Sequence, residues 1–350
     1  MKRYKCIVSY IGKNYDGFQS QSSHNSLQDV IEEAFTHISN ENIKIVASGR
    51  TDAKVNAQGQ VFHFDSAMDL SPYKWKGAIN GYLPDDIHIL DVQEVSDTFH
   101  ARYCVRKKQY DYKIHLHEYD VFTKDMAYQC PYDLDIQKMK EASTHLLGTH
   151  DFTSLNSSSL EEYPDQTRTI ERIDFHLEED MLTISFLAKG FLRYMVRMMV
   201  GLLIEVGKGN LEIDAIDRIL NEKSKRAFSK NAEPQGLTLK KVEYFDILSL
   251  NDDGMIREFI EGDRMIDGYT LDILDALPIN KKIYAFTTRN TQELLGYLEI
   301  KDTCHLYVFK KDNISVAQSL LDGLKKWLIR NNIEANISIC DLHDKIIEND

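Results

Sequence analysis

A single carboxylate lies beside an arginine in a short loop of mostly small residues. Asp52 follows Arg50 by two positions, and the loop separates an apolar run ending at Ala47 from another beginning at Val61. Loops held between strands concentrate catalytic and binding groups, so Asp52 is a candidate nucleophile. The same residues also fit an ordinary Asx turn, which requires no chemistry.

The segment containing this loop resembles the Gly-Arg-Thr-Asp-Ala signature of the TruA family of tRNA pseudouridine synthases. Other stretches keep the order of that family's landmarks, namely 10–21, 26–28, 83–87, 99–103, 108–112, 148–152, 195–197 and 234–237. A collinear series is far more specific than one short motif, and this resemblance spans about residues 1–246.

The resemblance implies an isomerase that converts uridine to pseudouridine at positions 38–40 of the tRNA anticodon arm without a cofactor. The bond from ribose C1′ to N1 breaks, the uracil turns, and C1′ joins C5, with no change in oxidation state. Such an enzyme needs an anionic group near the ribose, a proton-transfer group and a way to unstack the base. TruA proteins bind one tRNA across two subunits, so the resemblance also implies a homodimer.

The same motifs imply catalytic residues beside Asp52, which matches the family's essential Asp. Whether that Asp attacks the sugar, adds to the ring or takes a ribose proton stays open. Arg50 resembles the family Arg that enters the stem and stabilises the extruded base. Tyr110 matches the Tyr that packs on the target base and could relay a proton, and Tyr112 is the alternative on the same strand face.

Arg197 lies in a segment, 190–200, that is apolar almost all round and is therefore predicted to form a buried helix. An unpaired guanidinium would be costly there, so we expect Arg197 to pair with Asp52 and hold it ionised. A surface position, or Glu205 as partner, is the alternative. Arg193 lies four residues earlier, and this spacing fits a substrate contact and a solvated face equally well.

Charge is unfavourable for an RNA-binding protein, because Lys and Arg supply most of the affinity for phosphates. The net charge is −13, with 12 Lys and Arg against 18 Asp and Glu from residue 247 onward and 30 against 37 before it. Basic residues gather in clusters that would make a local positive track if arranged around one cleft. These clusters are Arg102, Arg106, Lys107 and Lys108; Arg168 and Arg172; Arg193 and Arg197; and Lys223, Lys225, Arg226 and Lys230.

The predicted substrate contacts comprise Arg102, Lys108 and Arg193 with two apolar residues. Phe152 and Leu237 are expected to wall the uracil pocket, although core packing explains them almost as well.

The loop departs from the family pattern at two positions. The family continues Ala-Gly-Val-His, whereas this chain has Lys54 and Asn56 at the second and fourth positions. A left-handed backbone would strain Lys54 by about 1 kcal/mol, so we expect a negative φ there. Asn56 keeps a hydrogen-bonding amide but cannot titrate, which puts a catalytic duty at that position in doubt.

Hydrophobic periodicity predicts a duplicated α+β pattern. The first half has strands 4–11, 43–48, 59–65 and 87–95, with helices capped by Ser26 and Ser71. The second half has strands 106–116, 170–177, 181–188 and 237–245, with helices 135–147, 190–206 and 213–221. The resemblance implies a pseudouridine synthase fold, in which the halves 1–105 and 106–246 join into one largely antiparallel sheet around a central cleft.

Residues 247–350 lie outside the resemblance. Strands 282–288, 296–300, 305–310 and 336–340 and a helix at 314–330 predict a small α+β accessory domain over 252–350. Its acidity disfavours phosphate binding, so we favour a protein partner or a positioning role for it.

Composition indicates a cytoplasmic protein without metal or membrane association. Five widely spaced cysteines form no Cys-x-x-Cys pair, and no apolar run approaches about 18 residues. His115 and His117 alternate onto one strand face, but the sequence suggests no third ligand. The alternative to an enzyme is an RNA-binding or RNA-chaperone protein that has lost catalysis, and a buried carboxylate with its own counter-ion argues against it.

Overall fold

The structure is a computed structural model that describes residues 1–39, 41–95, 99–102, 105–161 and 163–244, and beyond these only short strands between 265 and 349. The chain divides into two compact units. One comprises residues 4–93 and 106–243, and the other comprises 1–3, 94–105 and 244–350. The domain boundaries expected at 105/106 and 252 stay predictions.

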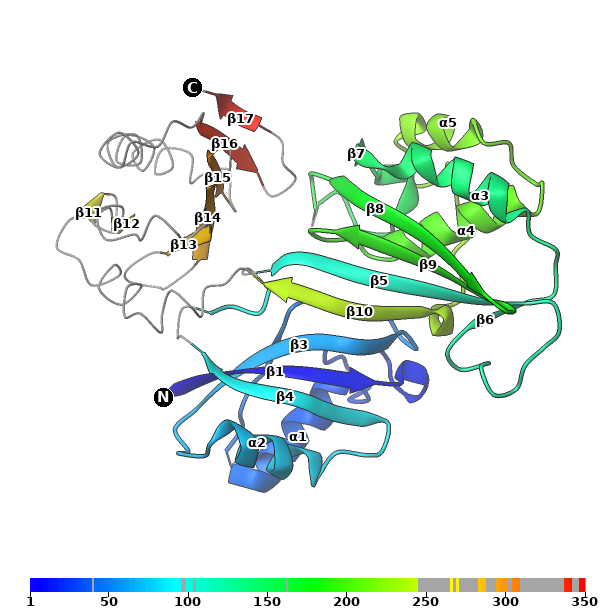
Figure 1. The fold of residues 1–350 in the computed structure, drawn as a ribbon. Helices are drawn as coiled ribbons and strands as arrows, with labels where there is room; N and C mark the ends of the chain where they lie inside the picture. The colour runs from blue at the N-terminus through cyan, green and yellow to red at the C-terminus, as the bar shows by residue number, and fades with distance from the viewer. Residues whose placement is uncertain are drawn as a thin grey trace. The chain divides into compact units, whose positions relative to one another are not determined.

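One mixed sheet of ten strands forms the frame of the larger unit (Figure 1). Its main path runs β4-β1-β3-β10-β5-β9-β8-β7, with β2 paired to β3 and β6 paired to β5. The strands are β1 (Lys2–Tyr10), β2 (Val46–Ala47), β3 (Asn56–Ser66), β4 (Ile87–Val95), β5 (Val105–Leu116), β6 (Tyr128–Cys130), β7 (Gly148–Asp151), β8 (Thr167–Glu178), β9 (Met181–Ala188) and β10 (Leu237–Tyr244).

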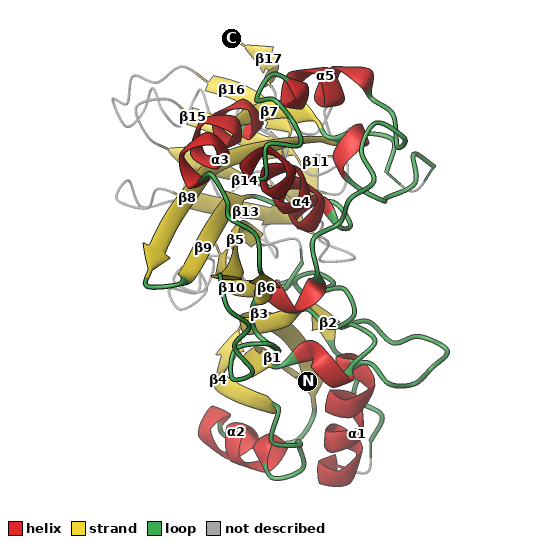
Figure 2. Cartoon of the chain, turned by 90° about the vertical axis from the view of Figure 1, so that its right-hand side faces the viewer, coloured by secondary structure: helices red, strands yellow, loops and turns green. Residues whose placement is uncertain are grey.

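Five α-helices accompany this sheet within the described residues. They are α1 (Leu27–Ser39), α2 (Pro72–Asn80), α3 (Ile136–Ser143), α4 (Met195–Gly207) and α5 (Ala215–Glu222). The views in Figures 1 and 2 place α1 and α2 beside β1, β3 and β4, and α3 to α5 beside β7, β8 and β9. The two halves of the α+β pattern therefore each carry their own helices, as the sequence predicted.

The two halves join where β10 inserts between β3 and β5. β10 pairs with β3 in parallel, with Thr238 opposite Asn56 and Leu239 opposite Ala57. The β2–β3, β5–β9, β7–β8 and β8–β9 pairs are antiparallel. The predicted fold class, α+β with a largely antiparallel sheet from two related halves, is confirmed.

Aromatic side chains fill the core of the first half. The Phe64 ring lies 4.5 Å from that of Phe35, 5.1 Å from that of Trp75 and 5.2 Å from that of Tyr4, centroid to centroid. All four side chains are buried. Residues of β3 are buried almost without alternation, because helices and neighbouring strands cover this central strand.

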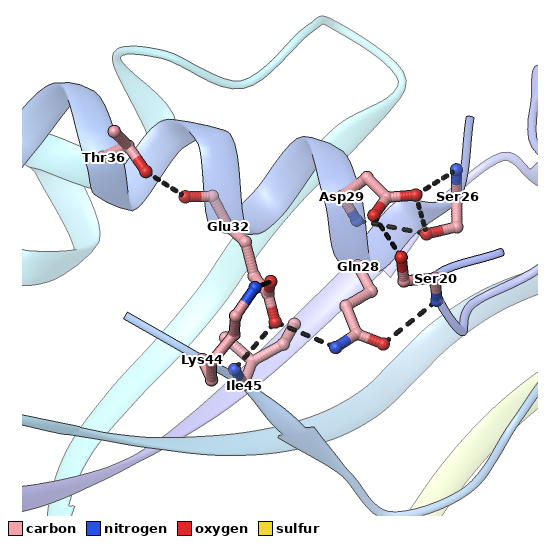
Figure 3. Close-up of polar contacts among 8 residues, drawn as sticks. All are labelled: Ser20, Ser26, Gln28, Asp29, Glu32, Thr36, Lys44 and Ile45. Atoms are coloured by element: carbon pink, nitrogen blue, oxygen red, sulfur yellow. Dashed lines mark hydrogen bonds and ion pairs between the residues drawn. The ribbon is translucent and has the colours of Figure 1, made fainter. Parts of the chain in front are cut away.

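Helix α1 fixes the segment that leads into the Asp52 loop (Figure 3). Ser26 caps the helix as predicted, since its Oγ accepts from the backbone N–H of Asp29 at 3.1 Å. Further along α1, the Glu32 carboxylate accepts from Lys44 Nζ at 2.7 Å and from the backbone N–H of Ile45 at 3.1 Å. The strand predicted over 43–48 is shorter in the structure, where β2 begins at Val46. The N–H of Ile45 donates to Glu32 and is therefore not available to a neighbouring strand.

The helix predicted over 190–206 begins later, at Met195. Tyr194 has φ of 63°, which breaks the helical path, and the carbonyl of Arg193 accepts from the N–H of Ser157 instead. The helix predicted over 135–147 ends at Ser143 and continues as a 3-10 turn, Thr144–Leu146. The later start of α4 thus coincides with a tertiary hydrogen bond from Ser157, whereas α3 ends in local bonds: Ser143 Oγ donates to the Lys140 carbonyl and Thr144 Oγ1 donates to the Glu141 carbonyl.

The C-terminal region contains a five-stranded sheet and a two-stranded ribbon. The sheet runs β13 (Ile283–Thr287), β14 (Leu294–Ile300), β15 (Cys304–Val308), β16 (Ile337–Asp341) and β17 (Ile346–Asn349), and β11 (Met265–Ile266) pairs with β12 (Tyr269–Thr270). Four of these strands overlap the four predicted ones. The helix expected at 314–330 lies outside the described residues.

Candidate active site

Three side chains hold the backbone that leads into the Asp52 loop. Ser48 Oγ donates to Gln60 Oε1 at 2.7 Å, and Gln60 Nε2 donates to the Gly49 carbonyl at 3.0 Å. Lys108 Nζ donates to the Ser48 carbonyl at 2.8 Å. Gln60 is completely buried, so its amide fixes the entry to the loop in one geometry.

The turn after β1 packs against the other side of the loop. Phe18 donates its N–H to the Thr51 carbonyl at 3.1 Å, and Gly17 has φ of +101°. A Cβ at Gly17 would lie 2.8 Å from the Thr51 carbonyl oxygen and 3.3 Å from the Asp52 carbonyl carbon. Only glycine allows this approach, because any side chain would push the loop away.

Asn56 joins three separate backbone segments at the end of the loop. Its Oδ1 accepts from the N–H of Gly12 at 2.8 Å, and its Nδ2 donates to the carbonyls of Gln235 at 3.0 Å and Asp125 at 3.3 Å. The side chain is buried. The amide that replaces the family's His is thus a structural link between the halves at this point.

Lys54 contradicts the expectation of a negative φ. Its φ is 65°, in the left-handed region. The N–H of Val55 donates to the Asp52 carbonyl at 3.2 Å, which closes a turn with Lys54 at the position where glycine is favoured. The family's glycine at this position fits that geometry, and Lys54 adopts it with strain.

Asp52 and Arg197 meet although 145 residues separate them. The Nη1 atom of Arg197 lies 3.4 Å from Oδ2 of Asp52, and the two side chains are 11% and 20% exposed. The carboxylate comes from the loop before β3, and the guanidinium comes from the first turn of α4. The predicted pairing of these two side chains is present in the structure.

Burial raises the pKa of Asp52 above its usual value, although Arg197 and, at longer range, Arg193 oppose this shift. Arg197 acts on Asp52 in the expected direction, because it favours the ionised carboxylate against the effect of burial. Desolvation therefore raises the pKa of Asp52 by more than the ion pair with Arg197 lowers it.

Backbone contacts set the direction of the Arg197 side chain. Its Nε donates to the Ala232 carbonyl at 2.8 Å, and the N–H of Ala232 donates to the Arg197 carbonyl at 3.0 Å. A Cβ at Gly201, one turn further along α4, would lie 2.8 Å from the Lys230 carbonyl oxygen. Gly201 therefore lets the chain at 230–232 approach α4 closely enough for the Ala232 carbonyl to accept from Arg197.

Glu205 is not the partner of Arg197. Its carboxylate pairs with Lys230 and accepts from Asn210 Nδ2 at 3.0 Å. This second pairing of an acid with a base lies two turns further along α4.

Tyr110 and Tyr112 both lie in β5, and each interacts electrostatically with one member of the Asp52–Arg197 pair, Tyr110 with Asp52 and Tyr112 with Arg197. Burial raises the pKa of Tyr110, and the nearby Tyr10 and Asp52 raise it further, so its hydroxyl stays protonated at neutral pH. The Tyr112 hydroxyl instead donates to the Glu233 carbonyl at 2.9 Å, and its ring packs against Gly236.

The remaining predicted contacts have different surroundings. Phe152 is fully buried, with its ring 5.9 Å from that of His150, and Leu237 is buried at the start of β10. Arg50 and Arg193 are exposed, and Lys108 supports the loop as described above. Arg102 belongs to the other compact unit. The roles assigned to these residues stay predictions.

Several basic residues of the predicted track already have partners inside the protein. Lys107 pairs with Glu171, and Lys223 Nζ lies 3.4 Å from Asp151 Oδ2. Lys225 Nζ donates to Gln166 Oε1 at 2.6 Å and to Asn156 Oδ1 at 2.8 Å. In this part of the chain, basic clusters stabilise the fold as well as adding positive charge.

The histidine pair has no metal-binding geometry. His115 lies near the end of β5, with its Nδ1 3.1 Å from the Glu118 carbonyl oxygen. His117 follows the strand with φ of 65°, so the two do not share one strand face. No group of three metal-binding side chains occurs among the described residues.

A cavity of about 440 Å³ has no residue of the Asp52 loop in its lining. Its lining comprises Glu205, Asn210, Leu211, Ile219, Arg226, Ala227, Phe228, Ser229 and Lys230, none of which belongs to the predicted uracil pocket.

Comparison with known proteins identifies the family. The family model described as tRNA pseudouridine synthase matches residues 6–104 and 142–245. The tRNA pseudouridine synthase A of a Geobacillus species is 43% identical over 245 residues, which cover 69% of this chain and 98% of that protein. The chain belongs to the tRNA pseudouridine synthase family. The family and the isomerase class predicted from the sequence are confirmed.

A second relative and one solved structure were also compared with the chain. The tRNA pseudouridine synthase A 1 of Bacillus cereus is 41% identical over 246 residues, which cover 70% of this chain and 99% of that protein. A chain of a solved Cbf5-Nop10-Gar1 complex is 12% identical, and the match covers 98% of this chain and 77% of that one. Its TM-score of 0.29 is too low to support an inference.

Sequence reasoning missed three residues that hold the site of this synthase. Gln60 donates to the carbonyl of Gly49 in the loop, and Ala232 accepts from Arg197 Nε. The Tyr194 ring lies against the guanidinium of Arg197. Gly201 in an apolar helix was a usable signal of close backbone approach. Gln60 and Ala232 carry no comparable signal.

Within the residues that the structure describes, no helix combines the length and the apolar character that a membrane span requires.

Proposed function

We propose that this chain isomerises uridine to pseudouridine at positions 38–40 of the tRNA anticodon arm, with Asp52 as the essential carboxylate. The observation that carries the proposal is the approach of Arg197 to Asp52 at 3.4 Å in a largely buried setting. A protein that only binds RNA needs no buried carboxylate with its own counter-ion, so this arrangement favours catalysis over the RNA-chaperone alternative.

The reaction needs no electron transfer. Glycosidic cleavage leaves a uracil whose N1 gains a proton, and bond formation at C5 releases the proton that C5 carried. Asp52 would act on the ribose or the ring while ionised, and Arg197 would stabilise its negative charge. The protonated hydroxyl of Tyr110 can donate a hydrogen bond to the uracil, and Arg50, exposed at the loop, can take the place of the extruded base.

The proposal extends to the setting of the reaction. By family likeness the chain acts as a homodimer that holds one tRNA across two subunits, in the cytoplasm. Phe152 and Leu237 would wall the uracil pocket, and Arg102, Lys108 and Arg193 would contact the RNA. The C-terminal region would bind a protein partner.

The test is to incubate the full chain with tRNA transcripts and map pseudouridine. We expect product at uridines 38, 39 and 40, and none in a matched transcript with cytidine at those positions. Binding of both transcripts without any product would support the RNA-binding alternative. Product only outside the anticodon arm would overturn the assigned positions.

A further inference from the structure

Tyr194 is the residue at which the path into α4 changes direction. Its φ of 63° is left-handed, a conformation that costs a tyrosine about 1 kcal/mol or more. Hydrogen bonds on both sides hold it there. The Arg193 carbonyl accepts from Ser157 N–H at 2.9 Å, and the Tyr194 carbonyl accepts from Met198 N–H at 2.9 Å. Strain kept in this way beside a reactive group invites a functional explanation.

The left-handed residue changes how Arg193 relates to Arg197. Arg193 precedes the helix, so the i,i+4 spacing of two helical residues does not bring the guanidinium groups together. The tyrosine ring does so instead. The guanidinium carbon atoms of Arg193 and Arg197 each lie 5.0 Å from the Tyr194 ring centroid, within cation–π range. Arg193 Nη2 also donates to the Tyr194 hydroxyl at 3.4 Å.

Both arginines act on the same carboxylate. Arg197 and Arg193 each lower the pKa of Asp52 against the larger effect of burial. Asp52 in turn raises the pKa of Tyr110. Two like charges near one site repel each other, and an aromatic face contacting both offsets part of that repulsion.

We propose that Tyr194 is a positioning residue whose ring holds the guanidinium groups of Arg193 and Arg197 in place around the carboxylate of Asp52. The expected effect of Tyr194 on the reaction rate rests on the proposed function, whereas its effect on the positions of the two guanidinium groups does not. No atom of Tyr194 has to touch the substrate.

Two substitutions separate the ring from the backbone. Tyr194→Phe keeps the ring and loses only the hydroxyl. Tyr194→Gly removes the ring but adopts the left-handed backbone without steric strain, so the turn into α4 is compatible with this change. Tyr194→Asn, which also tolerates that backbone, replaces the glycine variant if urea unfolding shows that the latter does not fold.

The matched control is Tyr132→Leu. Tyr132 also lies against a cation, with Lys208 Nζ 4.0 Å from its ring centroid, but at the C-terminal end of α4. This change removes a Tyr–cation contact far along the helix from Asp52, so it should leave the Asp52 titration and the rate unchanged.

The first measurement is the carboxyl titration of Asp52 by NMR in RNA-free protein, with Asp52→Asn as the assignment control. Tyr194→Gly should shift the titration to higher pH, whereas Tyr194→Phe and Tyr132→Leu should not. The second is the single-turnover rate at saturating tRNA and pH 7. It should fall roughly three- to thirty-fold in Tyr194→Gly and stay within about twofold in Tyr194→Phe.

An unchanged Asp52 titration in a folded Tyr194→Gly protein would overturn the positioning role. A shifted titration in a protein that forms no pseudouridine even as wild type would overturn the proposed function and leave the positioning role supported.

Discussion

Arg197 reaches Asp52 at 3.4 Å, yet the pKa of that carboxyl is still raised, because burial outweighs the ion pair. The RNA-free protein therefore holds a carboxylate that is poorly solvated and incompletely compensated. Such a group is more reactive as a base or nucleophile than one in water. Under the proposed function, this carboxylate would be prepared for the chemical step before the tRNA binds.

The pH dependence of the rate should report this balance. If ionised Asp52 is required, single-turnover pseudouridine formation rises with pH along a limb whose midpoint lies above the usual carboxyl value of 3.8. Arg197→Gln removes the main opposing charge, so the limb should move to still higher pH and the rate at pH 7 should fall about a hundredfold. An acid limb unmoved in Arg197→Gln would contradict the assigned pairing.

The same shift has a consequence for stability. Because the folded pKa of Asp52 is raised, its contribution to stability is lost as pH rises through that pKa. Asp52→Asn should therefore have a urea midpoint at pH 7 equal to or above that of the wild type, with the difference shrinking toward pH 4. A clearly lower midpoint for Asp52→Asn at pH 7 would show that the ion pair is net stabilising.

Close approach at Gly201 should be needed to hold Arg197. Gly201→Ala places a Cβ 2.8 Å from the Lys230 carbonyl oxygen, so we expect a loss of about 1–3 kcal/mol in unfolding free energy and a reduced rate. Gly77→Ala in α2 is the control, because its Cβ meets nothing within 4 Å, and it should stabilise the protein by about 0.5–1 kcal/mol. Equal effects of the two changes would argue against the close contact.

The left-handed backbone at Lys54 should be relieved by glycine. Lys54→Gly is expected to raise the unfolding free energy by about 0.5–1 kcal/mol in urea. Glu179→Gly, at φ of 52° in the exposed turn between β8 and β9, is the matched change and should stabilise similarly. If only Glu179→Gly stabilises, the side chain of Lys54 makes a contribution that offsets its strain.

The meeting of Asp52 and Arg197 was predictable because a guanidinium in an apolar helix requires an acid, and the family motifs pointed to Asp52. The supporting contacts were not predictable in the same way. Gln60 and Ala232 act through hydrogen bonds whose partners are set only by the folded chain. Tyr194 is left-handed despite its residue type, and no local pattern indicates that. The short β2 likewise depends on the distant Glu32 carboxylate.

The central claim is that the Asp52 carboxylate is required for the chemical step and not for tRNA binding. The direct measurement compares wild type with Asp52→Asn in single-turnover pseudouridine formation and in tRNA affinity at pH 7. We expect an affinity within about threefold and a rate lower by at least about a thousandfold. Pseudouridine formed by Asp52→Asn at the wild-type rate would contradict the account.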